Sequence, residues 1–231
     1  SMTSLAAVIV TVGLAASACG SSSSGGSSPG GGSGNKADVG LVFSSDAVAA
    51  SKGLVVLTDD KHLQASDNIV PVVAKSLATG PAATILNAID AKLDQKTLLQ
   101  LNTAVGVDHG QPADVASQFL SQAGLSGSSA CGGQGSGKIV VGSASFTENA
   151  LLGTIYAAAL KNCGYSTSTK TFDSREVYYP ALVKGKLQVV PEYAATLTDF
   201  INQQKNGANA PSKASGVIDT TMTALKAELP S

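Results

Sequence analysis

The chain is poor in the side chains on which most enzymes and nucleic-acid-binding proteins depend. It has no tryptophan, aromatic residues make up only 4% of its 231 residues, and charged residues make up 13%, with a formal net charge of -1. That balance leaves no basic excess for nucleic acid or anionic lipid. The two histidines have no Cys-x-x-Cys or His-x-x-x-His neighbours, and there is no nucleophile elbow or phosphate-binding loop. The sequence therefore indicates neither an enzyme nor a metal or cofactor site.

The first apolar run, Leu5–Ala16, is too short to span a bilayer and ends in small residues before Cys19. This is typical of a cleaved secretion signal. The stretch that ends in Cys19 resembles a bacterial lipobox, so residues 1–19 are predicted to be a lipoprotein signal whose cysteine is lipidated. Residues 20–36 then form a disordered Gly/Ser tether. The first charged residue is Lys36, whereas signals usually begin with basic residues, and Cys19 in a buried helix is the alternative.

Export would place the remaining cysteines, Cys131 and Cys163, in an oxidising compartment. A disulfide between them would close a loop of about 33 residues and stabilise the fold by roughly 3 to 4 kcal/mol. Two unlinked thiols are the alternative.

The rest of the chain has material for one domain of roughly 190 residues. Hydrophobic residues make up 43% of the sequence, which is typical of a globular protein. Short runs rich in Val, Leu and Ile predict buried strands over 38–43, 54–57 and 69–73. Three helices follow: one through Ile85, Leu86, Ile89 and Leu93, one that Asp94 caps, and one that Pro112 opens and Gly124 ends.

A Gly/Ser-rich linker, residues 126–137, divides the domain into segments 37–125 and 138–231. After the linker, strands are predicted over 138–141 and 187–191. Ser145–Glu148 fits a capping box at the start of a helix that ends before Gly164, and Asp173–Glu176 is a second such start, in which Pro180 predicts a kink or a later beginning. Helical spacing then predicts two final helices, through Leu197, Phe200 and Ile201 and through Ile218, Met222, Leu225 and Leu229.

Strands that alternate with helices predict a parallel sheet with helices on both faces. Ligands of such sheets bind beyond the carboxyl ends of the strands, where loops lead into helices. The candidate ligand-binding loops are therefore 43–46, 143–148 and 192–196.

Three motifs after the linker carry a family likeness: Ile139–Asn149 (IVVGSASFTEN), Ser174–Leu182 (SREVYYPAL) and Val189–Tyr193 (VVPEY). Together they resemble the glycine betaine/choline substrate-binding family of ABC importers. The segment before the linker resembles the same family, through Ala37–Asp46, Gly53–Asp60 and Asn68–Val73.

In that family the segment found here before the linker comes last, so the resemblance implies a circularly permuted order. It also implies the fold class: α/β, a three-layer αβα lobe of a type II periplasmic-binding-protein-like fold, with the second lobe absent. Residues 126–137 could extend roughly 35 to 40 Å to join the former termini. A rearranged gene product without a selected function is the plainer alternative.

The resemblance implies an extracytoplasmic solute-binding component that delivers glycine betaine, choline or a related osmoprotectant to ABC permease subunits. The lipid anchor at Cys19 would hold it on the outer face of the cytoplasmic membrane. The alternative is a non-binding remnant, or an interaction module that pairs with the permease, another lobe or a second copy as a homodimer. No cofactor, metal or nucleic acid is implied.

A quaternary ammonium ion donates no hydrogen bonds and is bound by aromatic faces. The resemblance places Tyr193 in such a cage with Thr196 as a polar contact, and Phe43 is a candidate second wall; core packing is the alternative for both rings. The helix start after Ser143 offers free amides to a carboxylate. Many relatives have a lysine where Ala144 stands, and its absence tilts the expectation toward choline-like ligands.

The complete set of predicted ligand-binding residues is Tyr193, Thr196, Phe43, Ser143, Ala144, Phe146, Thr147, Asp46 and Glu192. Asp46 either caps the Phe43 turn or faces the cation. Arg175 and Glu176 are interpreted as a helix start and surface pair, with a ligand role as the alternative.

Overall fold

A four-stranded sheet lies at the centre of the described chain. The computed structural model describes residues 7–9, 41–47, 52–55, 57–61 and 63–230. The strands of its main sheet lie in the spatial order β3 (Ile69–Val73), β6 (Val189–Tyr193), β4 (Lys138–Ala144) and β5 (Ser166–Phe172). The predicted strands at 69–73, 138–141 and 187–191 are thus confirmed, with β4 longer than expected and β6 shifted by two residues.

One strand of this sheet runs against the others. β4 is parallel to both β5 and β6, whereas β3 is antiparallel to β6. The prediction of a parallel sheet was therefore wrong for β3. This strand lies at the edge of the sheet with a single neighbour, so either direction satisfies its backbone, and an apolar run in the sequence carries no information on direction.

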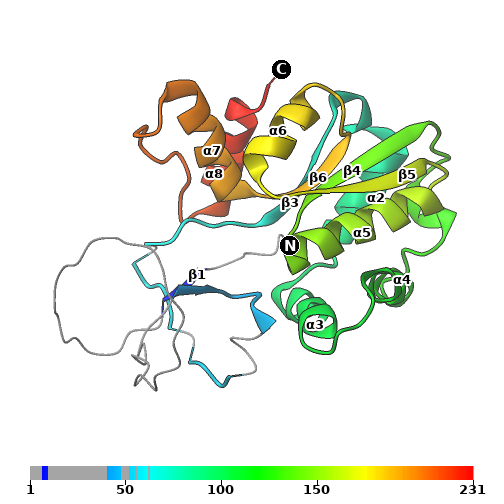
Figure 1. Cartoon of the computed structure of the whole chain (residues 1–231), viewed down its shortest axis with the longest axis horizontal. Coiled ribbons are helices and arrows are strands. Elements are labelled where there is room, and N and C mark those ends of the chain that lie inside the picture. Colours follow the sequence, from blue (N-terminus) through cyan, green and yellow to red (C-terminus); the bar gives the residue numbers. More distant parts are fainter. Residues whose placement is uncertain (1–6, 10–40, 48–51, 56, 62, 231) are drawn as a thin grey trace, which may run out of the picture.

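Helices cover both faces of the sheet (Figure 1). The helices of one layer are α2 (Gly80–Asp90), α3 (Gln95–Gly106), α4 (Pro112–Gln122) and α5 (Thr147–Asn162). Those of the other layer are α6 (Arg175–Val183), α7 (Ala194–Asn206) and α8 (Ile218–Glu228). Short 3-10 turns lie at η1 (Lys75–Leu77) and η2 (Ser128–Cys131). The arrangement is a three-layer αβα lobe, which confirms the predicted fold class.

Each face of the sheet has its own hydrophobic core. Ile85, Leu86 and Ile155 are among the fully buried side chains between the sheet and the α2–α5 layer. Tyr178 and Leu197 belong to the second cluster, on the α6–α8 side. Burial of one such side chain contributes about 1.5 to 3 kcal/mol, so both layers are held mainly by apolar contact.

The predicted helix boundaries follow from local chemistry. The side chain of Asp94 accepts a hydrogen bond of 2.7 Å from the backbone N–H of Thr97, which caps α3 as expected. Pro112 opens α4, where its missing N–H has no cost. Gly164 follows the end of α5 with a φ of 97°, a conformation that glycine adopts without strain. Helix α6 begins at Arg175 and continues through Pro180, although a later start was one of the two predicted outcomes.

Two predictions for strands did not match the structure. Leu54 and Val55, predicted as strand, lie in irregular chain and are 49% and 68% exposed. Strand β5, with the sequence STSTKTF, was not predicted. It is an edge strand exposed along most of its length, so it carries Thr and Ser rather than the apolar run that marks a buried strand.

The linker between the two segments is tied to the end of α5. Cys131 and Cys163 form a disulfide with a Cα–Cα distance of 5.6 Å, which joins η2 to the end of α5. The N–H of Gly135 also donates to the carbonyl of Cys163 at 2.7 Å. Segments on either side of the linker therefore pack as one lobe.

The pairing of β4 with β6 stops short of the end of the sheet where the candidate loops lie. These strands pair at Val189 but no further along, and Pro191 follows in β6. Proline has no N–H to give to a ladder. Asn149 instead bridges the two strands, accepting from the N–H of Ala144 at 2.7 Å and donating to the carbonyl of Pro191 at 3.0 Å. The start of α5 is thereby fixed between the ends of β4 and β6.

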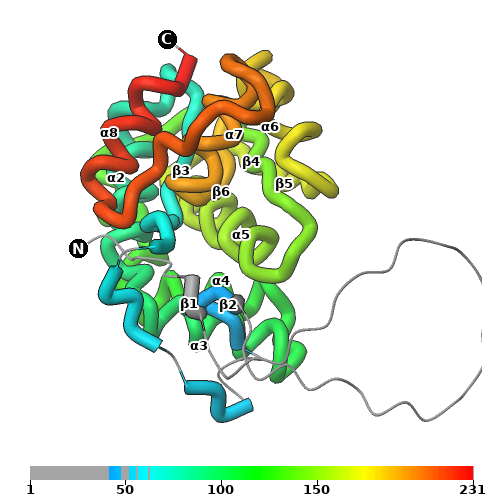
Figure 2. The backbone as a smooth tube through the Cα atoms, turned by 90° about the vertical axis from the view of Figure 1, so that its left-hand side faces the viewer, coloured from blue at the N-terminus to red at the C-terminus, as the bar shows by residue number. Residues whose placement is uncertain are grey.

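A short ribbon lies beside α3, away from the main sheet (Figures 1 and 2). It pairs β2 (Leu41–Phe43) antiparallel with β1 (Ala7–Ile9). Strand β1 falls within the predicted secretion signal, whereas Cys19 and the tether lie outside the described residues. Within the described ranges, no helix combines the length and apolarity needed to cross a bilayer.

Candidate ligand-binding site

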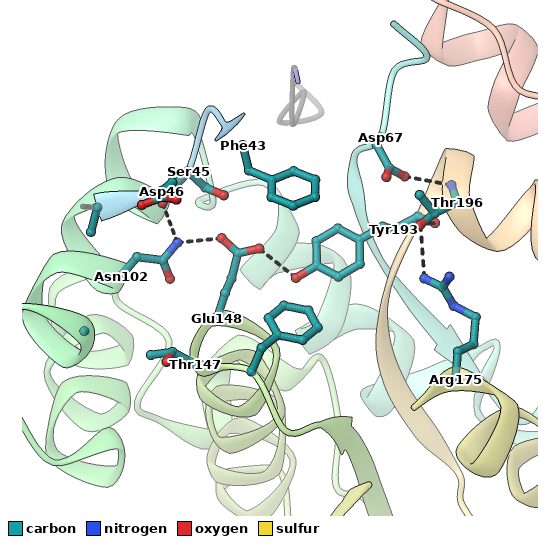
Figure 3. Close-up of a pocket in the computed structure, with 13 residues that line it drawn as sticks. Phe43, Ser45, Asp46, Asp67, Asn102, Thr147, Glu148, Arg175, Tyr193 and Thr196 are labelled. Carbon is teal, nitrogen blue, oxygen red and sulfur yellow. Dashed lines mark hydrogen bonds between the residues drawn. The ribbon is translucent and has the colours of Figure 1, made fainter. Parts of the chain in front are cut away.

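A cavity of about 530 Å³ lies where the three predicted loops meet. Its size falls in the range of small-molecule sites. Its walls come from β2 and the turn after it, α3, the start of α5, the start of α6 and the junction of β6 with α7 (Figure 3). The lining residues are Phe43, Ser45, Asp46, Ala47, Asp67, Asn102, Gly106, Phe146, Thr147, Glu148, Arg175, Tyr193 and Thr196.

Three aromatic rings line this cavity from three different elements. The rings of Phe146 and Tyr193 lie 5.9 Å apart between centroids, at an angle of 32°. Tyr193 is 8% exposed, whereas Phe146 and Phe43 are 51% and 59% exposed. Exposure of an apolar ring to water is unfavourable, and it is relieved when a ligand or partner covers the ring.

The carboxylate of Glu148 is held inside the cavity by two donors. Its Oε1 accepts from the hydroxyl of Tyr193 at 2.6 Å, and its Oε2 accepts from Nδ2 of Asn102 at 2.5 Å (Figure 3). Burial and the neighbouring charge of Glu148 raise the pKa of Tyr193 well above its ordinary value, so this hydroxyl stays protonated and donates. The network joins α3, α5 and β6 at one point.

Sequence reasoning assigned Glu148 to a capping box, and this was wrong. Helix α5 begins at Thr147 with Phe146 as its N-cap and without a side-chain cap. Ser145 therefore lies one residue too early to cap the helix, and the Glu148 side chain turns into the cavity instead.

Arg175 also reaches the cavity, but its charge is already paired. It donates to both carboxylate oxygens of Glu192, with Nη2 to Oε2 at 2.8 Å, and Glu192 is 1% exposed on the side chain. Burial alone would lower the pKa of Arg175, but the hydrogen bonds and charge of Glu192 raise it above its ordinary value. The hydroxyl of Tyr178 donates to the same carboxylate at 2.7 Å. Arg175 was predicted to pair with Glu176 but forms its ion pair with Glu192 instead.

Asp67 shapes the far wall of the cavity. Its Oδ1 accepts from the N–H groups of Ala195 and Thr196 at 2.7 and 3.1 Å, which satisfies two amides at the start of α7. Burial raises the pKa of Asp67 above its ordinary value, although these hydrogen bonds oppose the shift. A groove of about 470 Å³ continues from here along α7, past Phe200 and Gln203.

The lining as a whole is acidic and aromatic. Its charged residues are Asp46, Asp67, Glu148 and Arg175, and no lysine or histidine belongs to the lining that the structure describes. Over the described part of the chain, no three His, Cys, Asp or Glu side chains gather as metal ligands would. Such a site suits a small organic cation.

The family comparison agrees with this geometry. The model for the substrate binding domain of ABC-type glycine betaine transport system matches residues 33–122 and 137–227. The chain belongs to this family. No curated protein gives a significant match. The family is one of substrate-binding domains rather than enzymes, so the chain is a substrate-binding component of ABC glycine betaine transport, with a periplasmic-binding-protein-like lobe.

Most of the predicted ligand-binding residues of this substrate-binding domain meet at the cavity. Phe43, Asp46, Phe146, Thr147, Tyr193 and Thr196 all line it. Three others lie behind the lining. Ser143 is buried with its Oγ 3.4 Å from the hydroxyl of Thr171, Ala144 packs into the α6–α8 core, and Glu192 holds Arg175.

Four polar residues of the lining, Ser45, Asp67, Asn102 and Glu148, were not among the predicted ligand-binding residues, although Ser45 and Glu148 lie in candidate loops. Asp67 and Asn102 belong to no motif that the sequence analysis singled out. Asp67 precedes a strand, and Asn102 lies within a helix. Glu148 was singled out only for capping. A useful signal for Asn102 is its position on the buried side of an amphipathic helix, where an amide needs partners.

Proposed function

We propose that the cavity binds choline, glycine betaine or a related quaternary ammonium compound, which the protein delivers to ABC permease subunits. The observation that carries the proposal is the meeting of three aromatic rings, from Phe43, Phe146 and Tyr193, in a cavity with excess acidic charge. A trimethylammonium group cannot donate hydrogen bonds, and a ring face attracts it with about 0.5 to 2 kcal/mol. The family's glycine betaine transport role supports the same chemistry.

We propose further that the two segments build one lobe in circularly permuted order. Strand β3, from before the linker, pairs along its whole length with β6, from after the linker. Both flank the same cavity through Asp67 and Tyr193. The domain boundaries of this proposal remain 37–125 and 138–231, joined by residues 126–137.

Lipidation of Cys19 completes the proposal, with the protein anchored to the outer face of the cytoplasmic membrane. Cleavage before Cys19 would remove β1 and leave β2. The turn after Phe43 would then depend on its contacts with α3. These are the hydrogen bonds between Ser44 and Gln95, at 2.7 and 3.0 Å, and the donation from Asn102 to the carbonyl of Ser45 at 2.8 Å.

Titration calorimetry of the full chain tests the ligand class. Choline and glycine betaine are compared with the neutral isostere of choline, in which a tert-butyl group replaces trimethylammonium. Because the isostere keeps the shape and loses the charge, we expect it to bind about tenfold or more weakly than choline. Equal binding of choline and its isostere would show that the rings act as an apolar pocket only. If neither choline nor glycine betaine binds, the proposal is refuted.

The exposed rings of Phe43 and Phe146 favour a second candidate function, an interaction module that pairs with another lobe or a second copy. Sedimentation over a range of concentrations separates the two. A monomer that binds choline supports the single-lobe receptor, whereas a dimer that forms first and alone binds choline supports pairing.

A further inference from the structure

We infer that this cavity selects cations without a carboxylate over zwitterions, and that Glu148 sets this selection. The inference rests on the proposed function, since it concerns the same cavity. Choline and glycine betaine share the trimethylammonium group and differ at the other end, where one carries a hydroxyl and the other a carboxylate. The groups around the cage therefore decide between them.

Glu148 places a carboxylate beside the cage and forms no ion pair with any of the residues that the structure describes. The hydroxyl of Tyr193 and the amide of Asn102, which donate to it, are neutral groups, so they fix its position without cancelling its charge. Tyr193 is itself a wall of the cage, so the carboxylate lies one hydrogen bond from the ring. A cation is attracted there, and a second carboxylate is repelled.

The lobe gives up stability to hold Glu148 in this position. Asn102 is 8% exposed, and its Nδ2 donates both to Glu148 and to the carbonyl of Ser45. Its own Oδ1 is buried without a hydrogen-bond partner among the described residues. A buried acceptor without a hydrogen bond destabilises the folded state, so its presence needs an explanation beyond packing. Positioning of a selective carboxylate supplies that explanation.

The amides predicted to bind a carboxylate offer it little net attraction. The first turn of α5 already carries the carboxylate of Glu148 at the positive end of the helix dipole. The N–H of Ala144, at the end of β4, donates to Asn149. A ligand carboxylate at this helix start would therefore meet the charge of Glu148.

The remaining cation of the lining does not substitute for those amides. Arg175 is neutralised by Glu192 on one side, and Asp67 lies on the same wall with a second carboxylate. A ligand carboxylate near Arg175 would lie among one basic group, Arg175, and two acidic groups, Glu192 and Asp67. Its surroundings would therefore be net negative. The carboxylate of a zwitterion thus finds no net positive region in this cavity, whereas a monocation is attracted by the negative lining.

Competition between ligands in the full chain tests the inference. We expect choline and tetramethylammonium each to bind about tenfold or more tightly than glycine betaine, because only the betaine brings a second carboxylate to Glu148. In Glu148→Gln, which keeps the shape and removes the charge, the choline-to-betaine ratio should fall about tenfold toward equality. Glu148→Asp should retain the choline preference, and Asp219→Asn, which removes an exposed acid on α8 outside the cavity, should leave the ratio unchanged.

The outcomes separate this inference from the function on which it rests. Loss of all binding in the wild-type chain refutes the proposed function. Binding of both choline and betaine with equal affinity, or a betaine preference, overturns the selection while the function stands. A ratio unchanged in Glu148→Gln removes Glu148 as its cause. If Glu148→Gln does not fold, the wild-type ranking of tetramethylammonium against glycine betaine still decides whether the cavity rejects zwitterions.

Discussion

The two sides of the cavity are built very differently. Tyr193, Glu148 and Thr196 belong to β6, α5 and α7, whose apolar residues lie in the two cores. Phe43 is the last residue of β2, and Asp46 closes the turn that starts there, beside α3 (Figure 2). We call the first group the core wall and the Phe43–Asp46 turn the outer wall.

The two walls should therefore differ in how much they contribute to ligand affinity and to the stability of the fold. Within the core wall, Tyr193 is buried, Glu148 is half-buried and Thr196 is exposed. Loss of the Tyr193 ring should therefore disturb the fold and the ligand site together. The outer wall contributes the exposed ring of Phe43, and few hydrogen bonds join its turn to α3. Loss of this ring should therefore weaken ligand binding with little effect on the free energy of unfolding. Regions of few buried contacts are also those that open and close most readily.

The largest effect should follow Tyr193→Ala. We expect affinity for choline to fall about thirtyfold or more, because an aromatic face and the fixed position of Glu148 are lost together. The free energy of unfolding should fall by about 3 kcal/mol, since a buried ring leaves a cavity. Calorimetry and urea denaturation measure the two. Tyr193→Phe keeps the ring and loses only the hydroxyl, and should retain most of the affinity; equal losses in both variants would contradict a cation–ring contact.

Removal of the disulfide should affect the core side alone. In the double variant Cys131→Ser and Cys163→Ser, unfolding should become easier by roughly 3 to 4 kcal/mol, because the closed loop restrains the unfolded chain. Neither cysteine lines the cavity, so the choline affinity of the folded protein should stay within about twofold. A large loss of choline affinity would show that the disulfide at the end of α5 controls the geometry of the cavity at its start.

Asp90 makes the stability of the core side depend on pH. Burial raises the pKa of Asp90 to about 6, well above its ordinary value, so the folded state binds this proton more tightly than the unfolded state. The ionised form then destabilises the fold at neutral pH, and this cost is relieved as pH falls through about 6. Asp90→Asn should raise the free energy of unfolding at neutral pH by about 1 to 2 kcal/mol and flatten its dependence between about pH 4 and 6. Denaturation at several pH values checks this, and a variant less stable at neutral pH would contradict it.

The outer wall should respond in the opposite way. Phe43→Ala should weaken choline binding about fivefold, as expected for a partly exposed ring. Because the side chain is 59% exposed, the free energy of unfolding should change by less than about 0.5 kcal/mol. Phe43→Leu, which keeps apolar bulk without an aromatic face, is the matched control. Full affinity in Phe43→Ala would remove the outer wall from the site.

A smaller effect is expected where the outer wall is tied to α3. Gln95→Ala removes both hydrogen bonds with Ser44, and we expect it to weaken binding about threefold through a less fixed Phe43. Combined with Phe43→Ala it should add almost nothing, because both changes act on one contact. Fully additive losses would show that Gln95 acts by another route.

Local sequence patterns predicted those features that depend on neighbours in the chain. The Asp94 cap, the Pro112 start and the bounds of β3 were all visible, since each rests on residues within one turn or strand. Two of the three candidate loops, 143–148 and 192–196, meet at the cavity because β4 and β6 are parallel and bring their carboxyl ends together. Loop 43–46 also lines the cavity, but it reaches it from the separate ribbon rather than from the main sheet as expected.

Contacts between distant residues were not visible in the same way. The prediction of a capping role for Glu148 failed because its partners, Asn102 and Tyr193, lie 46 and 45 residues away in sequence. Arg175 was paired with its neighbour Glu176 rather than with Glu192 for the same reason. The direction of β3 was missed because an edge strand with one neighbour has no pattern for direction.

A crystal structure of the full chain grown with choline would test the central claim most directly. The account predicts density for the trimethylammonium group between the rings of Phe43, Phe146 and Tyr193, with its hydroxyl end beside Glu148. Choline bound elsewhere on a folded lobe, with these three rings uncovered, would contradict it.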